Sequence, residues 1–110
     1  MNYNVIPTPE FKKHFKKLYK KFPSLKNDLF QLIEKLENDY QIGISLGSNL
    51  YKIRIAIESK NKGKSGGAKV IYFFLVQEIE IYLLHIIDKS ELENLSKEKV
   101  LELLKRANLL

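Results

Sequence analysis

Apolar residues recur every three or four positions over the first 40 residues, which is the spacing of helices that bury one face. The first stripe consists of Phe11, Phe15, Leu18 and Phe22, and the second of Leu25, Leu29, Leu32, Ile33 and Leu36. Pro9 marks the start of the first helix and Pro23 ends it, because proline is poorly tolerated inside a helix. Ser24 is expected to cap the second helix, which runs to about Tyr40. The pattern predicts a helical hairpin joined at Pro23.

From residue 41 onward, the apolar pattern changes to that of strands. The strand-like segments are 44–46, 50–58, 69–76 and 79–88. In the second of these, apolar and polar residues alternate strictly, so Lys52 and Arg54 share the face opposite the isoleucines. The links between the last three segments are short, which favours an antiparallel meander.

The C-terminal part of the chain predicts a final helix. Residues 90–93 fit a capping box for one helical turn, and Ser96 can begin a helix that extends to Leu109. The expected fold class is therefore α+β, with an N-terminal helical hairpin packed on one face of a three- to four-stranded antiparallel sheet and a C-terminal helix. A chain of 110 residues is long enough for one core, so residues 1–110 are expected to form a single domain.

Composition narrows the possible chemistry. The chain has no cysteine and only two histidines, His14 and His85, so it has no disulfide framework and no thiolate metal site. We expect neither a metal nor another cofactor. The longest apolar stretch, 79–87, is too short to span a bilayer, and residues 1–9 do not resemble a signal peptide. We expect a cytoplasmic protein.

Positive charge is concentrated in two blocks. The net charge is +6, from 19 basic and 13 acidic residues. Residues 1–26 have a net charge of +6 and residues 52–69 of +5, whereas residues 27–51 (−3) and 70–110 (−2) are mildly acidic. Clustered cations attract polyanions, so nucleic acid, an anionic membrane surface and an acidic protein are candidate partners. The alternative is that the lysines only solubilise helix faces.

Several lysines are candidate RNA-binding residues, because positive side chains can contact the phosphate backbone without recognising the base sequence. They are Lys13, Lys17 and Lys20 of the first helix, Lys60, Lys62 and Lys64 of the glycine-rich turn, and Lys89 after the last strand. The turn is not a Walker A phosphate loop, because Glu58 stands where that motif requires its first glycine.

Strand parity gives a sharper candidate site. Lys52 and Arg54 lie about 7 Å apart on one face of a strand, and Lys69 joins them if the neighbouring strand has the matching register. Three fixed cations can stabilise the extra charge of a pentavalent phosphorane when RNA is cleaved through its own 2′-OH. The alternative is an ordinary solvated sheet face. Ile71, Phe73 and Leu75 share the side of Lys69, so they form an exposed apolar strip unless the last helix covers it.

Three further polar residues have two interpretations each. His14 is either a helix-surface histidine among lysines or a ligand or catalytic residue, and His85 is either a neutral sheet histidine or a general acid or base. Asp88 is either a proton-transfer partner or part of a normal strand-to-helix exit. Similarly, the aromatic run 72–74 is either core or a platform for stacking bases.

The segments 46–54, 63–72 and 83–91 together resemble the RelE/ParE/HigB superfamily of type II toxins, and the Gly-Lys-Ser-Gly-Gly turn is the most specific part. The resemblance implies a small toxin neutralised by a cognate antitoxin protein. It further implies a ribonuclease that cleaves mRNA at the ribosome, with Lys52, Arg54 and Lys69 as its basic residues. The RelE tyrosine near the C-terminus has no counterpart after Tyr82, which leaves His85 or Asp88 for proton transfer.

Two other functions stay open within the same superfamily. ParE-like toxins bind DNA gyrase without nuclease activity, and an inactive member would bind only nucleic acid or its antitoxin. In each case an acidic or amphipathic antitoxin segment is expected to cover the face with Lys52, Arg54 and Lys69.

Overall fold

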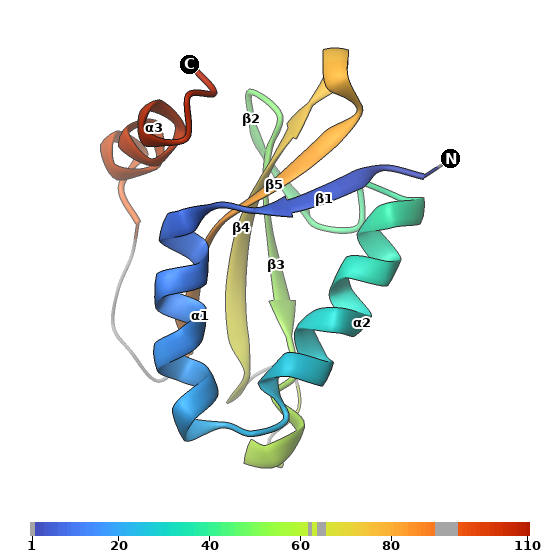
Figure 1. Ribbon diagram of the computed structural model, residues 1–110, viewed down its shortest axis with the longest axis vertical. Helices are drawn as coiled ribbons and strands as arrows, with labels where there is room; N and C mark the ends of the chain where they lie inside the picture. Colours follow the sequence, from blue (N-terminus) through green and yellow to red (C-terminus); the bar gives the residue numbers. More distant parts are fainter. Residues whose placement is uncertain (1, 62, 64–65, 90–94) are drawn as a thin grey trace.

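The computed structural model describes residues 2–61, 63, 66–89 and 95–110, which form three helices and a five-stranded sheet in the order β1-β5-β4-β3-β2 (Figure 1). The helices are α1 (Pro9–Lys21), α2 (Leu25–Asn38) and α3 (Lys97–Arg106). The strands are β1 (Asn4–Pro7), β2 (Ile44–Gly47), β3 (Leu50–Ile55), β4 (Ala68–Leu75) and β5 (Glu80–Asp88). The predicted α+β class is confirmed.

The N-terminal helical hairpin forms as expected, although one of its caps differs. Thr8 caps α1, because its hydroxyl accepts a hydrogen bond from the Phe11 amide at 3.3 Å and donates one to the Leu83 carbonyl at 2.8 Å. Ser24 occupies the N-cap position of α2 as predicted, but its side chain does not bond an amide of that helix. Its hydroxyl instead donates to Asp28 at 2.8 Å and accepts from the Ser59 amide at 2.8 Å.

The two hairpin helices pack against one side of the sheet, which we call the hairpin face (Figure 1). Its buried strand residues are Tyr51, Ile55, Ala68, Val70, Tyr72, Phe74, Ile81, Leu83 and Ile86. The buried helix residues are Phe11, Leu18, Leu25, Leu29, Leu32 and Leu36, which belong to the two stripes seen in the sequence. This apolar layer is the main core of the protein.

The antiparallel meander β3-β4-β5 is confirmed by its register. Leu50–Ile55 pair with Phe73–Ala68 of β4, and Ala68–Ile71 pair with Asp88–His85 of β5. A bulge then follows, since Tyr72 pairs with Leu83 and leaves Leu84 as an extra residue. Leu84 and Tyr82 lie on the side opposite the hairpin. His85 shares this side because it lies opposite Ile71.

The sheet contains one strand that the apolar pattern does not predict. β1 pairs in parallel with the N-terminal half of β5, from Asn4 opposite Glu80 to Pro7 opposite Leu83, so the sheet is mixed. Four residues that end in a proline show too little alternation to identify a strand. β1 forms because β5 offers it an edge that is distant in the sequence.

Helix α3 packs on the other side of the sheet, over part of the predicted apolar strip. Ser96 caps it as expected, accepting a hydrogen bond from the Lys99 amide at 3.2 Å. Its side chains Leu103 and Leu104 contact a cluster that includes Ile71, Phe73, Tyr82 and Leu84. The capping box proposed at residues 90–93 lies outside the described residues. Of the helices described, none is long and apolar enough to cross a membrane.

Candidate functional site

The side of the sheet opposite the hairpin has two parts, one covered by α3 and one that is cationic. Directly opposed residues of antiparallel strands point to the same side. Arg54 lies opposite Lys69, and Lys69 lies opposite Ile87, so these three residues form one row across the sheet. The next row contains Lys52, Ile71 and His85. The structure therefore brings Lys52, Arg54 and Lys69 together on one side, as strand parity predicts; we call this side the cation face.

Lys89 joins these three cations at the end of β5. Its amide donates to the Gly67 carbonyl at 2.9 Å, which holds the residue beside the start of β4. Local desolvation and the positive charges of Arg54, Lys69 and Lys52 lower the pKa of its ammonium group below the usual lysine value. The four side chains are thus close enough to interact electrically. A polyanion bound here would relieve their mutual repulsion.

Gly67 allows the ends of the strands to approach this closely. A Cβ atom at this position would lie 1.8 Å from the Ile55 carbonyl oxygen, so no residue with a side chain fits. The glycine-rich turn therefore has a structural function in joining β3 to β4. Within the turn, the Gly66 amide bonds the Gly63 carbonyl at 3.3 Å. Lys62 and Lys64, which were predicted to bind RNA, lie outside the described residues.

Asp88 and Lys60 form an ion pair on the hairpin side of the sheet. Asp88 lies opposite Ala68 and is buried, so its carboxylate points away from the cation face. The Lys60 ammonium lies 2.6 Å from this carboxylate and 4.9 Å from the centre of the Phe22 ring. The structure thus places Asp88, a candidate for proton transfer, and Lys60, a candidate for RNA binding, in contact with each other rather than with the four cations. In this position the pair fastens the exit of β3 to the exit of β5.

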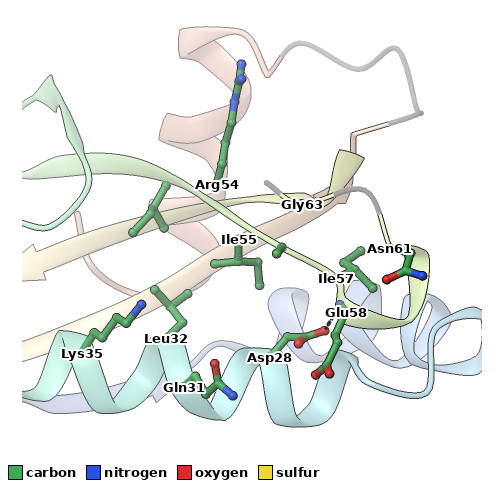
Figure 2. A pocket seen from close by; sticks show the side chains of 12 residues that line it. Asp28, Gln31, Leu32, Lys35, Arg54, Ile55, Ile57, Glu58, Asn61 and Gly63 are labelled. Atoms are coloured by element: carbon green, nitrogen blue, oxygen red, sulfur yellow. Dashed lines mark hydrogen bonds between the residues drawn. The ribbon is translucent and has the colours of Figure 1, made fainter. Parts of the chain in front are cut away.

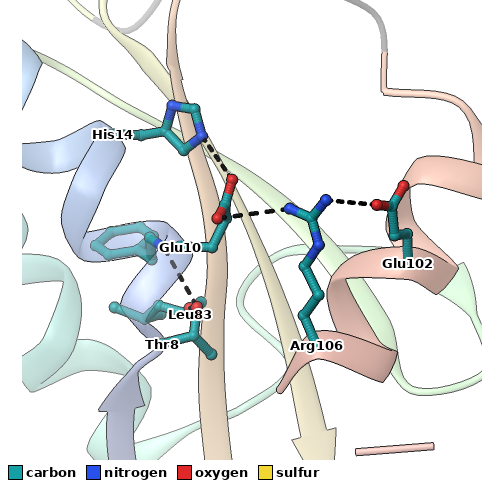
Figure 3. Close-up of polar contacts among 7 residues, drawn as sticks. Thr8, Glu10, His14, Leu83, Glu102 and Arg106 are labelled. Atoms are coloured by element: carbon teal, nitrogen blue, oxygen red, sulfur yellow. Dashed lines mark hydrogen bonds and ion pairs between the residues drawn. The ribbon is translucent and has the colours of Figure 1, made fainter. Parts of the chain in front are cut away.

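His85 shares the side of Lys52 but lies in the covered part. Its ring is buried and meets the ring of His14 edge to face, with 4.6 Å between the ring centres. His14 Nε2 lies 3.3 Å from a Glu10 oxygen, and Arg106 of α3 bridges Glu10 and Glu102 (Figure 3). These residues line a small pocket of about 230 Å³, to which Lys99 and Leu103 of α3 also contribute. The two histidines therefore belong to the junction between α1, β5 and α3.

The remaining candidates are placed away from the four cations. Lys13, Lys17 and Lys20 are exposed on α1, whose buried residues pack on the hairpin face. The aromatic run at 72–74 packs in the interior. Tyr72 is fully buried, with its hydroxyl donating to the Tyr40 carbonyl at 2.8 Å, and burial raises its pKa to about 12. Phe74 stacks on Tyr40 with 4.0 Å between ring centres. Tyr72 and Phe74 are thus core residues.

Metal binding has little support in the described part of the chain. There, no group of three or more histidine, aspartate or glutamate side chains is arranged to hold a metal ion. Lys52, Arg54, Lys69 and Lys89 offer only ammonium and guanidinium groups, which bind anions and repel metals. Its chemistry is therefore that of a phosphate or carboxylate site.

The protein-family comparison decides the class to which this chain belongs. The model of the RelE toxin of the RelE/RelB toxin–antitoxin system matches residues 11–110. The chain belongs to the RelE toxin family. It is a toxin of a type II toxin–antitoxin system, and its partner is a cognate antitoxin. The resemblance seen in the sequence motifs is confirmed.

Solved structures show the same fold at low sequence identity. A mutant of the Escherichia coli toxin RelE in the free state superposes with a TM-score of 0.64 and 17% identity, covering 96% of this chain and 98% of the other. One chain of the intact E. coli RelBE toxin–antitoxin complex gives a TM-score of 0.60 and 16% identity, covering 81% of this chain and 98% of that one. The isolated E. coli RelE toxin gives a TM-score of 0.51 and 19% identity, covering 94% of this chain and 97% of that chain.

The grouping of Lys89 with the other three cations was not predicted from the sequence. Only a general role in RNA binding was assigned to this residue. The missing signal was the register between β4 and β5, because Lys89 reaches the cation face only if Ile87 lies opposite Lys69. Parity along β5 places Lys89 on the side of Ile87, but only the pairing of Ile87 with Lys69 shows that this is the side of the other three cations.

Proposed function

We propose that this toxin is a metal-independent ribonuclease that cleaves mRNA at the ribosome and acts in the cytoplasm. The observation that supports the proposal is the meeting of Lys52, Arg54, Lys69 and Lys89 on one side of the sheet. Such a group of cations suits a phosphodiester, and the strand register fixes where Arg54 and Lys69 stand. Membership of the RelE family favours RNA as the polyanion.

In the proposed reaction, the 2′-oxygen of the RNA attacks the adjacent phosphorus while its proton passes to water. The bond to the 5′-oxygen of the next nucleotide breaks, which leaves a 2′,3′-cyclic phosphate. Negative charge builds up on the phosphorane oxygens between these two events. Arg54 is suited to a two-pronged contact with these oxygens, whereas Lys52 and Lys69 act as point charges. Because the side chains are held by a sheet, little reorganisation is needed as the charge develops.

The 5′-oxygen must receive a proton as it leaves, and we assign this proton to the Lys89 ammonium group. The lowered pKa of Lys89 makes it a better acid than an ordinary lysine. Asp88 is less suited to proton transfer, because it faces the hairpin side and pairs with Lys60. His85 could reach the RNA only after α3 had moved, because it is buried beside that helix.

The exposed lysines of α1 are assigned a second role, contact with the phosphates of the ribosome. Lys13, Lys17 and Lys20 lie on a surface separate from the four cations, so they contribute to binding rather than to cleavage. Replacing all three with glutamine should lower the slope of log K against log salt by about two to three, roughly one for each phosphate contact. Ribosome binding measured over a salt series checks this, and an unchanged slope would return these lysines to a solubilising role.

Expression in a bacterial host tests the proposed function directly. Primer extension on mRNA after induction should show discrete cleavage sites in translated regions, and cleavage should persist with chelator-treated components. A supercoiling assay with purified gyrase should show no inhibition. Intact mRNA together with inhibited gyrase would instead establish a ParE-like toxin. Growth arrest that affects neither target would reject both assignments.

A further inference from the structure

Lys89 follows β5 directly and lies at one end of the cation face. Its amide bonds the Gly67 carbonyl at 2.9 Å, so the antiparallel pairing of β4 and β5 continues to this residue. Residues two positions apart on an extended strand share one side, about 7 Å from each other. Lys89 is therefore on the side of Ile87 and of Lys69, which lies opposite Ile87, and its side chain is exposed to solvent.

Three other cations share this side. Arg54 and Lys69 lie opposite each other on β3 and β4, and Lys52 lies two residues before Arg54. Figure 2 shows the Arg54 side chain directed away from α2, which packs on the hairpin face. The positive charges of all three act on the Lys89 ammonium group. The strand register thus fixes a cluster of four cations in which Lys89 is the exposed lysine, since Lys52 and Lys69 are half-buried.

This environment changes the chemistry of the Lys89 amine in two ways. Desolvation and the neighbouring positive charges lower its pKa below the ordinary lysine value, so a larger fraction of the amine is unprotonated near neutral pH. An unprotonated amine is a nucleophile, whereas an ammonium group is not. The same neighbours attract small dianions to the position beside the amine. The cluster therefore suits an electrophile that itself carries a phosphate group.

An acyl phosphate combines these two features. Its carbonyl carbon is bonded through one oxygen to a phosphate, so cations that hold the phosphate also place the carbonyl beside the amine. Lys60, the lysine that follows β3, lacks this environment. Its ammonium group is largely buried and lies 2.6 Å from the Asp88 carboxylate, which favours the charged form.

We propose that Lys89 is an acylation site at which an acyl phosphate modifies the toxin without a separate acyltransferase. The ammonium group first loses a proton to water, and the free amine then attacks the carbonyl carbon. The bond from this carbon to the phosphate oxygen breaks. Inorganic phosphate leaves with the electron pair of that bond and takes up one proton of the attacking nitrogen. Arg54 and Lys69 stabilise the leaving phosphate, and the product is an uncharged amide on Lys89.

Acylation should switch off RNA cleavage, and this consequence rests on the proposed function. It removes one of the four charges that face the phosphodiester, together with the proton that we assign to the leaving 5′-oxygen. It also relieves the repulsion between Lys89 and its three neighbours, so the acylated toxin should remain folded. The modification would therefore lower activity without unfolding the protein.

Purified full-length toxin incubated with acetyl phosphate tests the site, with acetylation followed over time by peptide mass spectrometry. Lys26, which is exposed on α2, is the reference lysine in the same molecule. The initial rate at Lys89 should exceed that at Lys26 by at least about tenfold, because a more nucleophilic amine and a held phosphate act together. A rate at Lys89 no greater than that at Lys26 would overturn the proposal.

A double variant, Arg54→Ala with Lys69→Ala, removes two of the neighbouring cations. It should lose most of the preference for Lys89, whereas the rate at Lys26 should stay unchanged. A preference that survives in the folded double variant would show that the cluster does not cause it, which contradicts the proposal.

A neutral acyl donor separates the reactivity of the amine from the binding of phosphate. With N-acetoxysuccinimide, which has no phosphate, the ratio of acetylation at Lys89 to that at Lys26 should be smaller than with acetyl phosphate. Added inorganic phosphate should slow only the reaction of Lys89 with acetyl phosphate, because it competes for the same cations. Equal ratios with the two donors would refute the phosphate-binding step.

The two proposals can fail separately, because mass spectrometry reads acetylation without RNA. Toxin acetylated at Lys89 that still cleaves mRNA at the wild-type rate would reject Lys89 as the proton donor of the ribonuclease. Absence of selective acetylation at Lys89 would reject only the acylation site. Thermal melts of the acetylated toxin confirm that any loss of cleavage occurs in folded protein.

Discussion

Strands β3, β4 and β5 supply both faces of the sheet, but different interactions act on the two faces. The hairpin face is an apolar layer in which Val70, Leu83 and Ile86 are buried against α1 and α2. The cation face places Arg54 and Lys69 side by side at a cost in repulsion and uses α3 to cover only its apolar part. Stability therefore depends mainly on the first face, and activity is expected to depend on the second. Substitutions on the two faces should separate these effects.

The largest expected difference in the free energy of unfolding is between the substitution of one core residue and the substitution of one exposed cation. Leu83→Ala should lower the free energy of unfolding by about 2–5 kcal/mol, because it leaves a cavity in the main core. Arg54→Ala should change it by less than about 0.5 kcal/mol, since the side chain is exposed. Urea denaturation of both variants checks the comparison. If Arg54→Ala destabilises the fold as much as Leu83→Ala does, the two faces are not separable.

The Lys60–Asp88 ion pair should also stabilise the fold, although both residues lie near the four cations of the proposed ribonuclease site. Asp88→Asn should cost up to about 3 kcal/mol, because it leaves the largely buried Lys60 ammonium without its charged partner. Lys60→Met should have a similar effect, and the double variant should cost less than the sum of the two. Additive losses in denaturant titrations would show that the two side chains are not coupled.

The hydroxyl of Tyr72 joins the core to the segment before β2, since it donates to the Tyr40 carbonyl and accepts from the Gly43 amide at 2.9 Å. Tyr72→Phe should cost about 1–3 kcal/mol, because it leaves these two groups unsatisfied. The contribution of this hydroxyl to stability depends on pH. The folded-state pKa of about 12 lies above the ordinary 10.0, so the contribution of the neutral tyrosine is complete below pH 10.0 and is lost as pH rises toward 12.

Denaturant midpoints of the wild type and Tyr72→Phe, measured across this alkaline range, check the prediction. The advantage of the wild type should shrink above pH 10.0. An advantage that stays constant would show that Tyr72 does not ionise with the raised pKa.

The smallest expected effect is a slight stabilisation, whereas the core and ion-pair substitutions above destabilise the fold. Lys89→Gln should slightly raise the melting temperature at neutral pH, because it relieves repulsion with Arg54, Lys69 and Lys52. Since the folded-state pKa is lowered, the wild-type lysine loses its charge in the folded protein first. The gain should therefore shrink as pH rises toward the ordinary lysine value of 10.5. A lower melting temperature at neutral pH would mean that Lys89 makes favourable contacts instead.

The sequence allowed the helical hairpin, the meander and the shared side of Lys52 and Arg54 to be predicted, because helix and strand periodicities are local. It did not reveal β1, whose four residues form a strand only because β5 offers an edge. The bulge at Leu84 was also missed, as was the pairing of Asp88 with Lys60. These features depend on register between distant segments, which no local pattern records. The candidate site was therefore predictable where it follows parity on one strand and not where it needs neighbouring strands.

Single-turnover cleavage of ribosome-bound mRNA by purified toxin tests the central claim most directly. Arg54→Ala and Lys69→Ala should each lower the cleavage rate constant by at least about 100-fold, because each removes a fixed charge from the phosphorane site. Their melting temperatures should match that of the wild type, and Lys26→Ala, an exposed charge elsewhere, should cleave normally. Folded Arg54→Ala and Lys69→Ala toxins that cleave at the wild-type rate would contradict the assignment of the cation face as the ribonuclease site.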